Sequence, residues 1–292
     1  MNPVTSILNG GLGNQLFQFA AARALALRLE TDVRLDQRRL LKRGLRTYAL
    51  DDFALNEQVS TICEGRLPED RSKLRRTIAK IFAGKNADPT FREADFAYDA
   101  RHADIQQSVR LDGYFQSYKY FAPYAEAIRS DLTPRLDLRA EIEGKRSKLI
   151  PASSCVSMHV RRKDYTNPEI SAVHGVLHPD YYARALSVMN ALLPDPPIIC
   201  VFTDDPQWVR DNLDLPPNAR YISEQTTSAF EDFILMSRCD HHITANSSFS
   251  WWGAWLNPRS DKVVITPEQW FQPEVMQKLD ISDLRPVEWL TV

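Results

Sequence analysis

The sequence predicts an α/β protein whose second half is built on a parallel, doubly wound sheet. Short apolar segments between residues 155 and 265 alternate with segments of helical character. This alternation is typical of parallel strands that are buried between helices on both faces. The first half also begins with a strand, a glycine loop and a helix. The length of 292 residues has room for two such domains.

The expected elements follow from hydrophobic periodicity. In the first half we expect strands at 4–8, 32–36 and 109–115 and helices at 14–29 and 118–132. In the second half the expected strands are 155–160, 198–202, 220–222, 242–244 and 263–265, and the expected helices are 179–193, 206–213, 228–239 and 247–257. A charged stretch between Pro134 and Pro151 predicts the domain boundary, with domains over residues 1–150 and 151–292.

Composition excludes several classes of protein. The net charge of −2 gives no electrostatic basis for binding nucleic acid. No apolar run reaches the roughly 20 residues of a membrane span, and the first residues lack the basic start and apolar core of a signal peptide. The four cysteines form no C-x-x-C pair, and three of them lie in apolar runs or at helix ends, where we expect free cysteine to act as a small hydrophobe. A reducing, cytoplasmic location is therefore expected.

Polar side chains follow three strands of the predicted second sheet. His159 and Arg161 lie at the end of the first strand, Asp204 and Asp205 follow the second, and residues 246–249 follow the fourth. Ligands of open parallel sheets bind beyond the carboxyl ends of the strands. These residues therefore predict a site for one nucleotide-like ligand.

Arg161 and Arg162 are the candidate phosphate ligands at this edge. The guanidinium fork matches two phosphate oxygens at once. Successive strand residues point to opposite faces, so only one arginine should face the ligand. We expect Arg161 to do so and Arg162 to pair with a local carboxylate such as Asp164; the alternative is that both make structural salt bridges.

Residues 246–255, NSSFSWWGAW, predict a helix start of unusual composition. The unpaired N–H groups of a helix N-terminus suit a phosphate, and the hydroxyls of Ser247 and Ser248 would complete the pocket. The alternative is an ordinary buried helix with a serine cap.

The glycine loop at residues 10–13 allows close approach of a backbone to a ligand. It lacks the third small residue of the dinucleotide fingerprint, because Gln15 stands there. An NAD-linked oxidoreductase is therefore disfavoured. Asn14 and Gln15 instead offer amide groups to a phosphate or a polyhydroxylated ligand.

No metal site is expected from the sequence. Asp204 and Asp205 lack the spacer of an Asp-x-Asp metal motif, and Asp205 before Pro206 is typical of a helix cap. His241 and His242 alternate faces of a strand, so they cannot easily bind one ion.

Four motifs occur in a fixed order: GGLGNQLFQ, HVRRKDY, FTDD and NSSFSWWGAW. Together they resemble the bacterial α-1,2-fucosyltransferase family, which is distantly similar to the α-1,6- and protein-O-fucosyltransferases. The resemblance runs from about residue 7 to 270, with an unmatched stretch at 56–105. It implies two Rossmann-like domains facing across a cleft (the GT-B type). It also implies a metal-independent, inverting transfer of L-fucose from GDP-β-L-fucose to the 2-OH of a terminal β-galactoside.

The resemblance assigns roles to individual residues. The second domain would hold GDP-fucose, which is a substrate and not a cofactor, and the first would form the acceptor side. His159 matches a contact to the guanine nucleotide, Arg161 a β-phosphate ligand, and Asp232 a carboxylate that reads guanine; the alternative for Asp232 is a first-turn helix charge. The remaining donor-binding residues are expected to be Asn14, Gln15, Asn246, Ser247, Ser248 and Phe249.

The general base has three candidates. Glu169 lies eight residues after Arg161, where the α-1,6 relatives have a catalytic glutamate, although Asn167-Pro168 departs from their pattern. Asp164 is the second candidate. His174 is the third, and it is also assigned to the acceptor side.

One segment is a candidate for membrane contact. Between Arg66 and Lys85 the chain has seven basic and two acidic residues, with apolar residues on one helical face. This pattern predicts either a surface helix packed on the first domain or a basic amphipathic helix that docks on anionic lipid.

Overall fold

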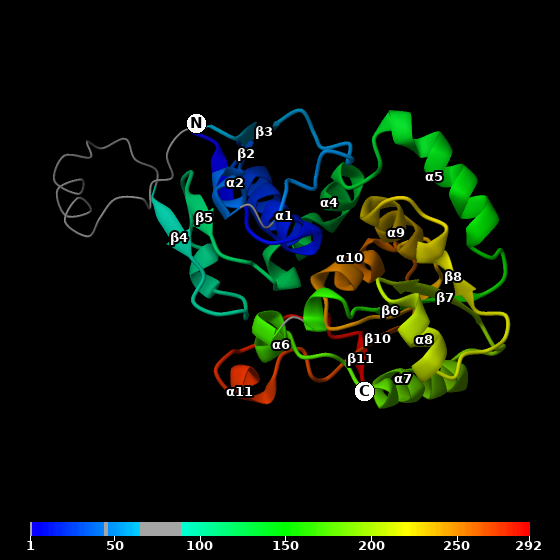
Figure 1. Ribbon diagram of the computed structural model, residues 1–292. Coiled ribbons are helices and arrows are strands. Elements are labelled where there is room, and N and C mark those ends of the chain that lie inside the picture. Colours follow the sequence, from blue (N-terminus) through cyan, green and yellow to red (C-terminus); the bar gives the residue numbers. More distant parts are fainter. Residues whose placement is uncertain (1, 44–45, 65–88, 167) are drawn as a thin grey trace. The chain divides into compact units, whose positions relative to one another are not determined.

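The computed structural model describes residues 2–43, 46–64, 89–166 and 168–292 (Figure 1). The chain divides into two compact units. Unit 1 comprises Met1–Thr133 and Asp280–Arg285, and unit 2 comprises Pro134–Leu279 and Pro286–Val292. The basic segment at residues 66–85 lies outside the described residues, so its role stays a prediction. None of the helices in the described ranges is long and apolar enough to cross a bilayer.

Unit 1 contains a five-stranded parallel sheet in the order β3-β2-β1-β5-β4. Its strands are β1 (Val4–Ile7), β2 (Val33–Asp36), β3 (Val59–Ile62), β4 (Thr90–Arg92) and β5 (Arg110–Asp112). Its helices are α1 (Leu12–Arg28), α2 (Arg38–Arg43) and α4 (Ala125–Asp131), with 3-10 turns at Ala100–His102, Tyr118–Tyr120 and Ala122–Tyr124. Helix α1 is buried along nearly its whole length, which explains its run of alanines.

Two expectations for unit 1 are wrong in detail. The single helix expected at 118–132 is instead two 3-10 turns followed by α4, because Pro123 at the start of the second turn cannot continue a hydrogen-bonded helix. The strand expected at 109–115 shortens to Arg110–Asp112. Phe115 has a positive φ of 54°, which ends the extended backbone.

Unit 2 contains a six-stranded parallel sheet in the order β11-β10-β9-β6-β7-β8. Its strands are β6 (Cys155–Val160), β7 (Ile198–Thr203), β8 (Arg220–Tyr221), β9 (His241–Ile243), β10 (Val264–Thr266) and β11 (Leu290–Thr291). Its helices are α5 (Leu136–Leu149), α6 (Pro168–His174), α7 (Pro179–Leu192), α8 (Pro206–Asn212), α9 (Ala229–Met236), α10 (Ser248–Leu256) and α11 (Pro273–Met276), with 3-10 turns at Asp164–Thr166 and Ile222–Glu224. The predicted parallel, doubly wound sheet is confirmed, whereas a cleft between two domains stays a prediction.

The two faces of the second sheet have separate cores. Val156, Met158 and Val160 of β6 pack with residues of α7 and α8. The alternate side chain Cys155 faces the other way and packs with residues of α9. The sheet therefore carries helices on both faces, as a doubly wound fold requires.

The glycine loop after β1 has a specific backbone requirement. Gly10 has φ of 82°, and a Cβ built on it would lie 2.4 Å from Nδ2 of Asn14. Gly11, the N-cap of α1, has φ of −81°, and nothing lies within 4 Å of a Cβ at that position. Only the first of these two glycines is therefore fixed by geometry.

We expect Gly10→Ala to lower the stability of unit 1 by about 1–2 kcal/mol, because an L-residue is strained at this φ. Gly11→Ala should cost less than about 1 kcal/mol. Urea unfolding followed by circular dichroism measures both variants. All six tryptophans belong to unit 2, so their fluorescence should report an unchanged transition. Equal losses in the two variants would contradict this account.

Candidate active site

The candidate site lies at the carboxyl edge of the second sheet, where the strand order reverses. From β6 the chain proceeds outward through β7 and β8, and then returns to the other side of β6 through β9, β10 and β11. Strands β6 and β9 are therefore neighbours whose following loops leave in opposite directions. This point of reversal is where open α/β sheets bind ligands.

The loop after β9 forms the capped start of α10. Ser247 is the N-cap, and its Oγ accepts a hydrogen bond from the N–H of Phe249 at 3.3 Å. Ser250 Oγ accepts from the N–H of Ala245 and donates to the carbonyl of Ser247. The serine cap and the burial of the helix, which were the alternative, are confirmed, and a phosphate pocket at this helix start stays a prediction.

The aromatic run holds this helix start in place. Trp251 and Trp252 have no exposed surface, and their rings meet edge to face with centroids 5.2 Å apart. On the same helix, Gly253 allows close contact with α9, because a Cβ there would lie 2.7 Å from Sδ of Met236. The position of the helix N-terminus is therefore fixed by close packing.

His159 and Phe249 come together beside this helix start. Their ring centroids are 5.5 Å apart, and Phe249 also contacts Phe233 of α9 at 5.4 Å. His159 is the fifth residue of β6 and is buried. The structure thus joins two predicted donor-binding residues, one from the end of β6 and one from α10, which follows β9.

Arg161 and Arg162 have different surroundings, as strand alternation predicts. Arg161 Nε lies 3.5 Å from Oδ2 of Asp204 and its side chain is 28% exposed. The Arg162 guanidinium lies 3.8 Å over the ring of Trp208. Arg161 is therefore the more accessible of the two, and the planar face of Arg162 is used in cation–π packing.

The expected pairing of Arg162 with Asp164 stays a prediction, because the side chain of Asp164 lies outside the described residues. The carboxylate near Arg162 is Asp205, with Nε and Oδ2 3.8 Å apart. The Arg162 N–H donates to Asp204 at 2.8 Å. Because β6 and β7 are hydrogen-bonded neighbours, the residues after β7 are closer to these arginines than sequence distance suggests.

Asp232 is held at the same edge by hydroxyl groups. Ser223 donates to its Oδ2 at 2.6 Å, and Thr226 donates to its Oδ1 at 2.7 Å. Ser223 Oγ also accepts from the N–H of Thr203 at the end of β7. Burial raises the pKa of Asp232. It is thus a first-turn residue of α9 with a fixed carboxylate, and each oxygen keeps capacity for a further donor.

Two residues assigned to donor binding make structural contacts within their own units. Gln15 has no exposed surface; its Nε2 donates to the carbonyls of Gly10 and Thr47, and its Oε1 accepts from the N–H of Ala49. These bonds tie residues 47–49 to the glycine loop. Asn14 lies in the first turn of α1, and its Oδ1 accepts from Nε2 of Gln116 at 2.8 Å.

Asn246 is similarly engaged in unit 2. It is 2% exposed, and its Nδ2 donates to the carbonyls of His174, Gly175 and Trp270. This amide therefore links the end of β9 to the end of α6. Both residues that flank this link, Asn246 and His174, line a cavity of about 750 Å³.

The three candidate bases follow β6 in a short turn and in α6. The backbone of Asp164 opens the 3-10 turn and that of Glu169 lies in α6, but their side chains are outside the described part of the structure. The ring of His174 stacks on Tyr165 with centroids 5.1 Å apart and contacts Phe271 at 5.3 Å. His174 is therefore packed between two aromatic rings.

Asp205 and His241, which belong to the two pairs considered as metal ligands, both accept backbone hydrogen bonds, and the absence of a metal stays a prediction. Asp205 Oδ1 caps α8 by accepting from the N–H of Trp208. His241 Nδ1 accepts from the N–H of Val263. Elsewhere, however, three buried thiols come together. The cysteines are far apart in the chain, so no sequence motif indicates this cluster.

His242 lies in a buried polar network between Ser157 and Asn257. Its Nε2 accepts from Nδ2 of Asn257 at 2.9 Å, so the neutral ring carries its proton on Nδ1, which is 2.7 Å from Ser157 Oγ. In this tautomer the ring is a donor to the serine and cannot act as its base. The network is therefore structural, although it contains a Ser, a His and an Asn.

This network predicts a pH dependence of stability. Burial lowers the pKa of His242 from 6.5 to about 3, so only the unfolded chain binds this proton between those values. The free energy of unfolding should therefore fall as the pH decreases below 6.5, by up to about 1.4 kcal/mol per pH unit from this residue. His242→Gln should flatten the slope between pH 6 and 5, measured by tryptophan fluorescence in urea. His178→Gln, at an exposed position, is the control; identical slopes for wild type and His242→Gln would contradict the account.

Comparison with known proteins adds to this geometry. Residues 90–292 match Glycosyl transferase family 11. The chain is 32% identical over 310 residues to the Escherichia coli O-antigen biosynthesis glycosyltransferase WbnK, covering 95% of this chain and 98% of the relative. It is 28% identical over 303 residues to an Escherichia coli alpha-1,2-colitosyltransferase, covering 100% and 99%. A Caenorhabditis elegans galactoside 2-alpha-L-fucosyltransferase is 30% identical over 190 residues, covering 61% and 51%.

Solved structures show the same fold. The α-1,6-fucosyltransferase NodZ, co-crystallised with GDP, superposes with a TM-score of 0.52 at 18% identity over 91% of this chain and 96% of that chain. A mutant of Arabidopsis thaliana FUT1 in complex with GDP gives a TM-score of 0.53 at 13% identity over 93% and 72%. The predicted fold class of two parallel α/β sheets and the predicted enzyme class are confirmed. The family match over residues 90–292 and the nearly full-length similarity to WbnK show that the chain belongs to glycosyl transferase family 11.

Proposed function

We propose that this chain is a galactoside α-1,2-fucosyltransferase, which transfers L-fucose from GDP-β-L-fucose to the 2-OH of a terminal β-galactose. The observation that carries the proposal is the convergence of Arg161, Asp232 and the start of α10 at one edge of one sheet. Each of these groups suits a different part of a GDP-sugar. We assign the donor to residues 151–292 and the acceptor side to residues 1–150.

The leaving group is GDP, and its developing charge needs stabilisation. The N–H groups at the start of α10 and the hydroxyls of Ser247 and Ser248 would donate hydrogen bonds to the diphosphate. Arg161 would add a charge-assisted hydrogen bond to the β-phosphate. Donors that are already fixed by packing are effective here, because they need no reorganisation as charge develops.

The guanine base of the donor would have partners of its own in this site. Asp232 has two oxygens that are held by Ser223 and Thr226. Its remaining lone pairs would accept the two N–H groups of guanine, which present adjacent donors. His159 and Phe249 would flank the nucleotide. Hydroxyl groups, which leave the charge of Asp232 available to a ligand, suit this assignment.

The transfer itself would proceed in one displacement. The acceptor 2-oxygen attacks the anomeric carbon from the face opposite GDP, the bond to the β-phosphate oxygen breaks, and a base takes the acceptor proton. The β-linked donor would thus give an α-linked product. Glu169 and Asp164, which follow Arg161 in the chain, are the proposed bases, and His174 is the third candidate.

A colitosyl donor is the second candidate. One relative that spans the whole chain is an α-1,2-colitosyltransferase. Colitose lacks the 3-hydroxyl of fucose, and a site that hydrogen-bonds a hydroxyl discriminates strongly against a sugar that lacks it. Turnover should therefore differ clearly between the two donors.

The test is a donor screen with purified protein. GDP-fucose, GDP-colitose, GDP-mannose and UDP-galactose are each supplied with N-acetyllactosamine or lactose, and the product is analysed by NMR. We expect an α-linked fucose on the galactose 2-oxygen. Turnover with GDP-colitose alone would favour the second candidate. Protection from unfolding by GDP without turnover of any donor would indicate a non-catalytic binding module.

We expect Arg161→Ala to lower kcat about a hundredfold, because loss of a contact to the leaving phosphate costs about 3 kcal/mol. Arg161→Lys should recover little, since an ammonium cannot replace the guanidinium fork. Steady-state kinetics with GDP-fucose measure both. Arg146→Ala, on the exposed side of α5, is the matched control and should match wild type. A folded Arg161→Ala that keeps more than about a third of wild-type turnover would rule out this role.

Transfer is also proposed to need no metal, since Arg161 and the helix start supply the positive charge. Brief treatment with excess EDTA should leave the initial rate unchanged. If the rate falls and is restored by Mg²⁺ or Mn²⁺, then Asp204 and Asp205 become metal ligands and the proposal of metal-free transfer is lost. The tryptophan unfolding transition, recorded before and after EDTA, separates this outcome from a loss of folded protein.

A further inference from the structure

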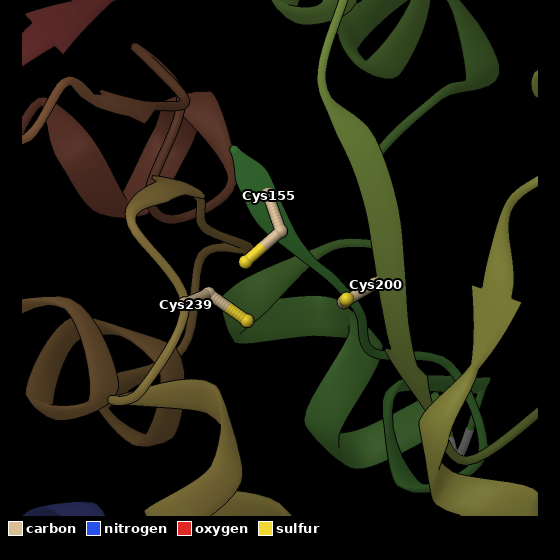
Figure 2. A group of neighbouring side chains, drawn as sticks. All are labelled: Cys155, Cys200 and Cys239. Atoms are coloured by element: carbon tan, nitrogen blue, oxygen red, sulfur yellow. The ribbon is translucent and has the colours of Figure 1, made fainter. Parts of the chain in front are cut away.

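Three thiols meet at the edge of the second sheet that is opposite to the candidate active site. The Sγ atoms of Cys155, Cys200 and Cys239 all lie within 4.8 Å of one another (Figure 2). All three residues are buried, with at most 1% of their surface exposed. The fourth cysteine, Cys63, belongs to unit 1 and is exposed.

Strand register explains the convergence. Cys155 is the first residue of β6, and Ser157 pairs with Cys200 of β7. Cys155 and Cys200 are therefore on the same face of neighbouring strands, two positions apart. Cys239 precedes β9 on the other side of β6, and the N–H of Asp240 donates to the Cys155 carbonyl at 3.1 Å. The three thiols thus come from β6, from β7 and from the segment just before β9.

A carboxylate stands at the border of the cluster. Asp240 Oδ2 lies 3.5 Å from Cys155 Sγ and accepts the N–H of Cys155 at 3.0 Å. Its other oxygen, Oδ1, lies 3.3 Å from Nη1 of Arg259. Asp240 is therefore oriented by two partners, which is the outer support that metal-binding carboxylates usually have.

We propose that Cys155, Cys200, Cys239 and Asp240 form a site for one zinc-like, thiophilic divalent ion. Three sulfur ligands and one oxygen complete the four-coordinate set that Zn²⁺ prefers. In such a tetrahedron, zinc–sulfur bonds of about 2.3 Å place the sulfurs about 3.8 Å apart. For the three sulfurs, the observed limit of 4.8 Å therefore requires only a small contraction. Asp240 Oδ2 lies 3.5 Å from Cys155 Sγ but is not within 4.8 Å of all three sulfurs, so its side chain would move toward the ion.

The surroundings favour an ion over three separate thiols. Ile150, Phe202 and Leu235 pack against the cluster, so it is dry on that side. If these three positions required only a small buried apolar side chain, alanine or valine would fit equally well. That requirement alone would not explain why three sulfurs from distant segments meet. An ion neutralises thiolates that an apolar core could not otherwise hold, and binding such an ion contributes directly to folding.

The site is separate from the transfer reaction. Cys155 begins β6 and Arg161 follows its end, so six residues of strand, or about 20 Å, lie between them. The ion would tie β6, β7 and the approach to β9 together from the amino edge of the sheet. Its role is therefore structural, and it is compatible with metal-free transfer.

The experiment refolds the reduced full-length chain with and without Zn²⁺ and measures bound zinc and the tryptophan-reported Tm. We expect one zinc per chain and a higher Tm with Zn²⁺. Titration with Cd²⁺ should give the ultraviolet thiolate charge-transfer band. Cys63→Ser is the matched control and should behave as wild type. Cys239→Ala should weaken Cd²⁺ binding by more than the 10- to 100-fold that loss of an outer-shell partner costs, and Asp240→Asn should weaken it less.

Three results would overturn the proposal. The first is refolded wild-type protein with all thiols free and no bound zinc. The second is a Cd²⁺ band that persists in Cys239→Ala or disappears in Cys63→Ser. The third is loss of two thiols to a disulfide, counted after denaturation. If Cys239→Ala does not fold, X-ray absorption of the zinc-loaded wild type decides, because a first shell without sulfur excludes the site.

Discussion

The reversal of strand order between β6 and β9 is the constraint on which the rest of unit 2 depends. Two parallel neighbours whose connections leave toward opposite faces cannot fill the space beyond their own ends. That space is bordered by the residues after β6, which include Arg161, and by the capped start of α10. The candidate site therefore follows from topology, and the side chains determine only what it binds.

Packing behind the site fixes the polar groups that the topology places at the edge of the sheet. Trp251 and Trp252 fix α10 in the core, and Ser223 joins the end of β7 to Asp232. The helix start and the Asp232 carboxylate at the edge are thus held by the protein itself before any ligand arrives. Preorganised donors stabilise developing charge without a cost of reorganisation, so the tryptophan-rich helix acts on function through rigidity.

The sequence predicted what depends on local pattern. Strands β6 and β7, the cap at Ser247 and the grouping of His159 with Phe249 could be anticipated from periodicity and from polar residues at strand ends. Contacts set by neighbouring strands could not: Arg162, which follows β6, lies near Asp205, which follows β7. Edge strands such as β3, which is partly exposed, lack a clear apolar alternation and were also missed.

With the proposed ion at the cysteine cluster, the second sheet would bind an anion at its carboxyl edge and a cation at its amino edge. At the carboxyl edge, helices such as α10 begin, and their N–H groups favour an anion such as a diphosphate. At the amino edge, helices end, and α9 closes at Met236 just before Cys239. Carbonyl groups at a helix end favour a cation and disfavour thiolates without one. A parallel sheet of this kind therefore separates a site for a leaving phosphate from a site for a structural ion by the length of a strand.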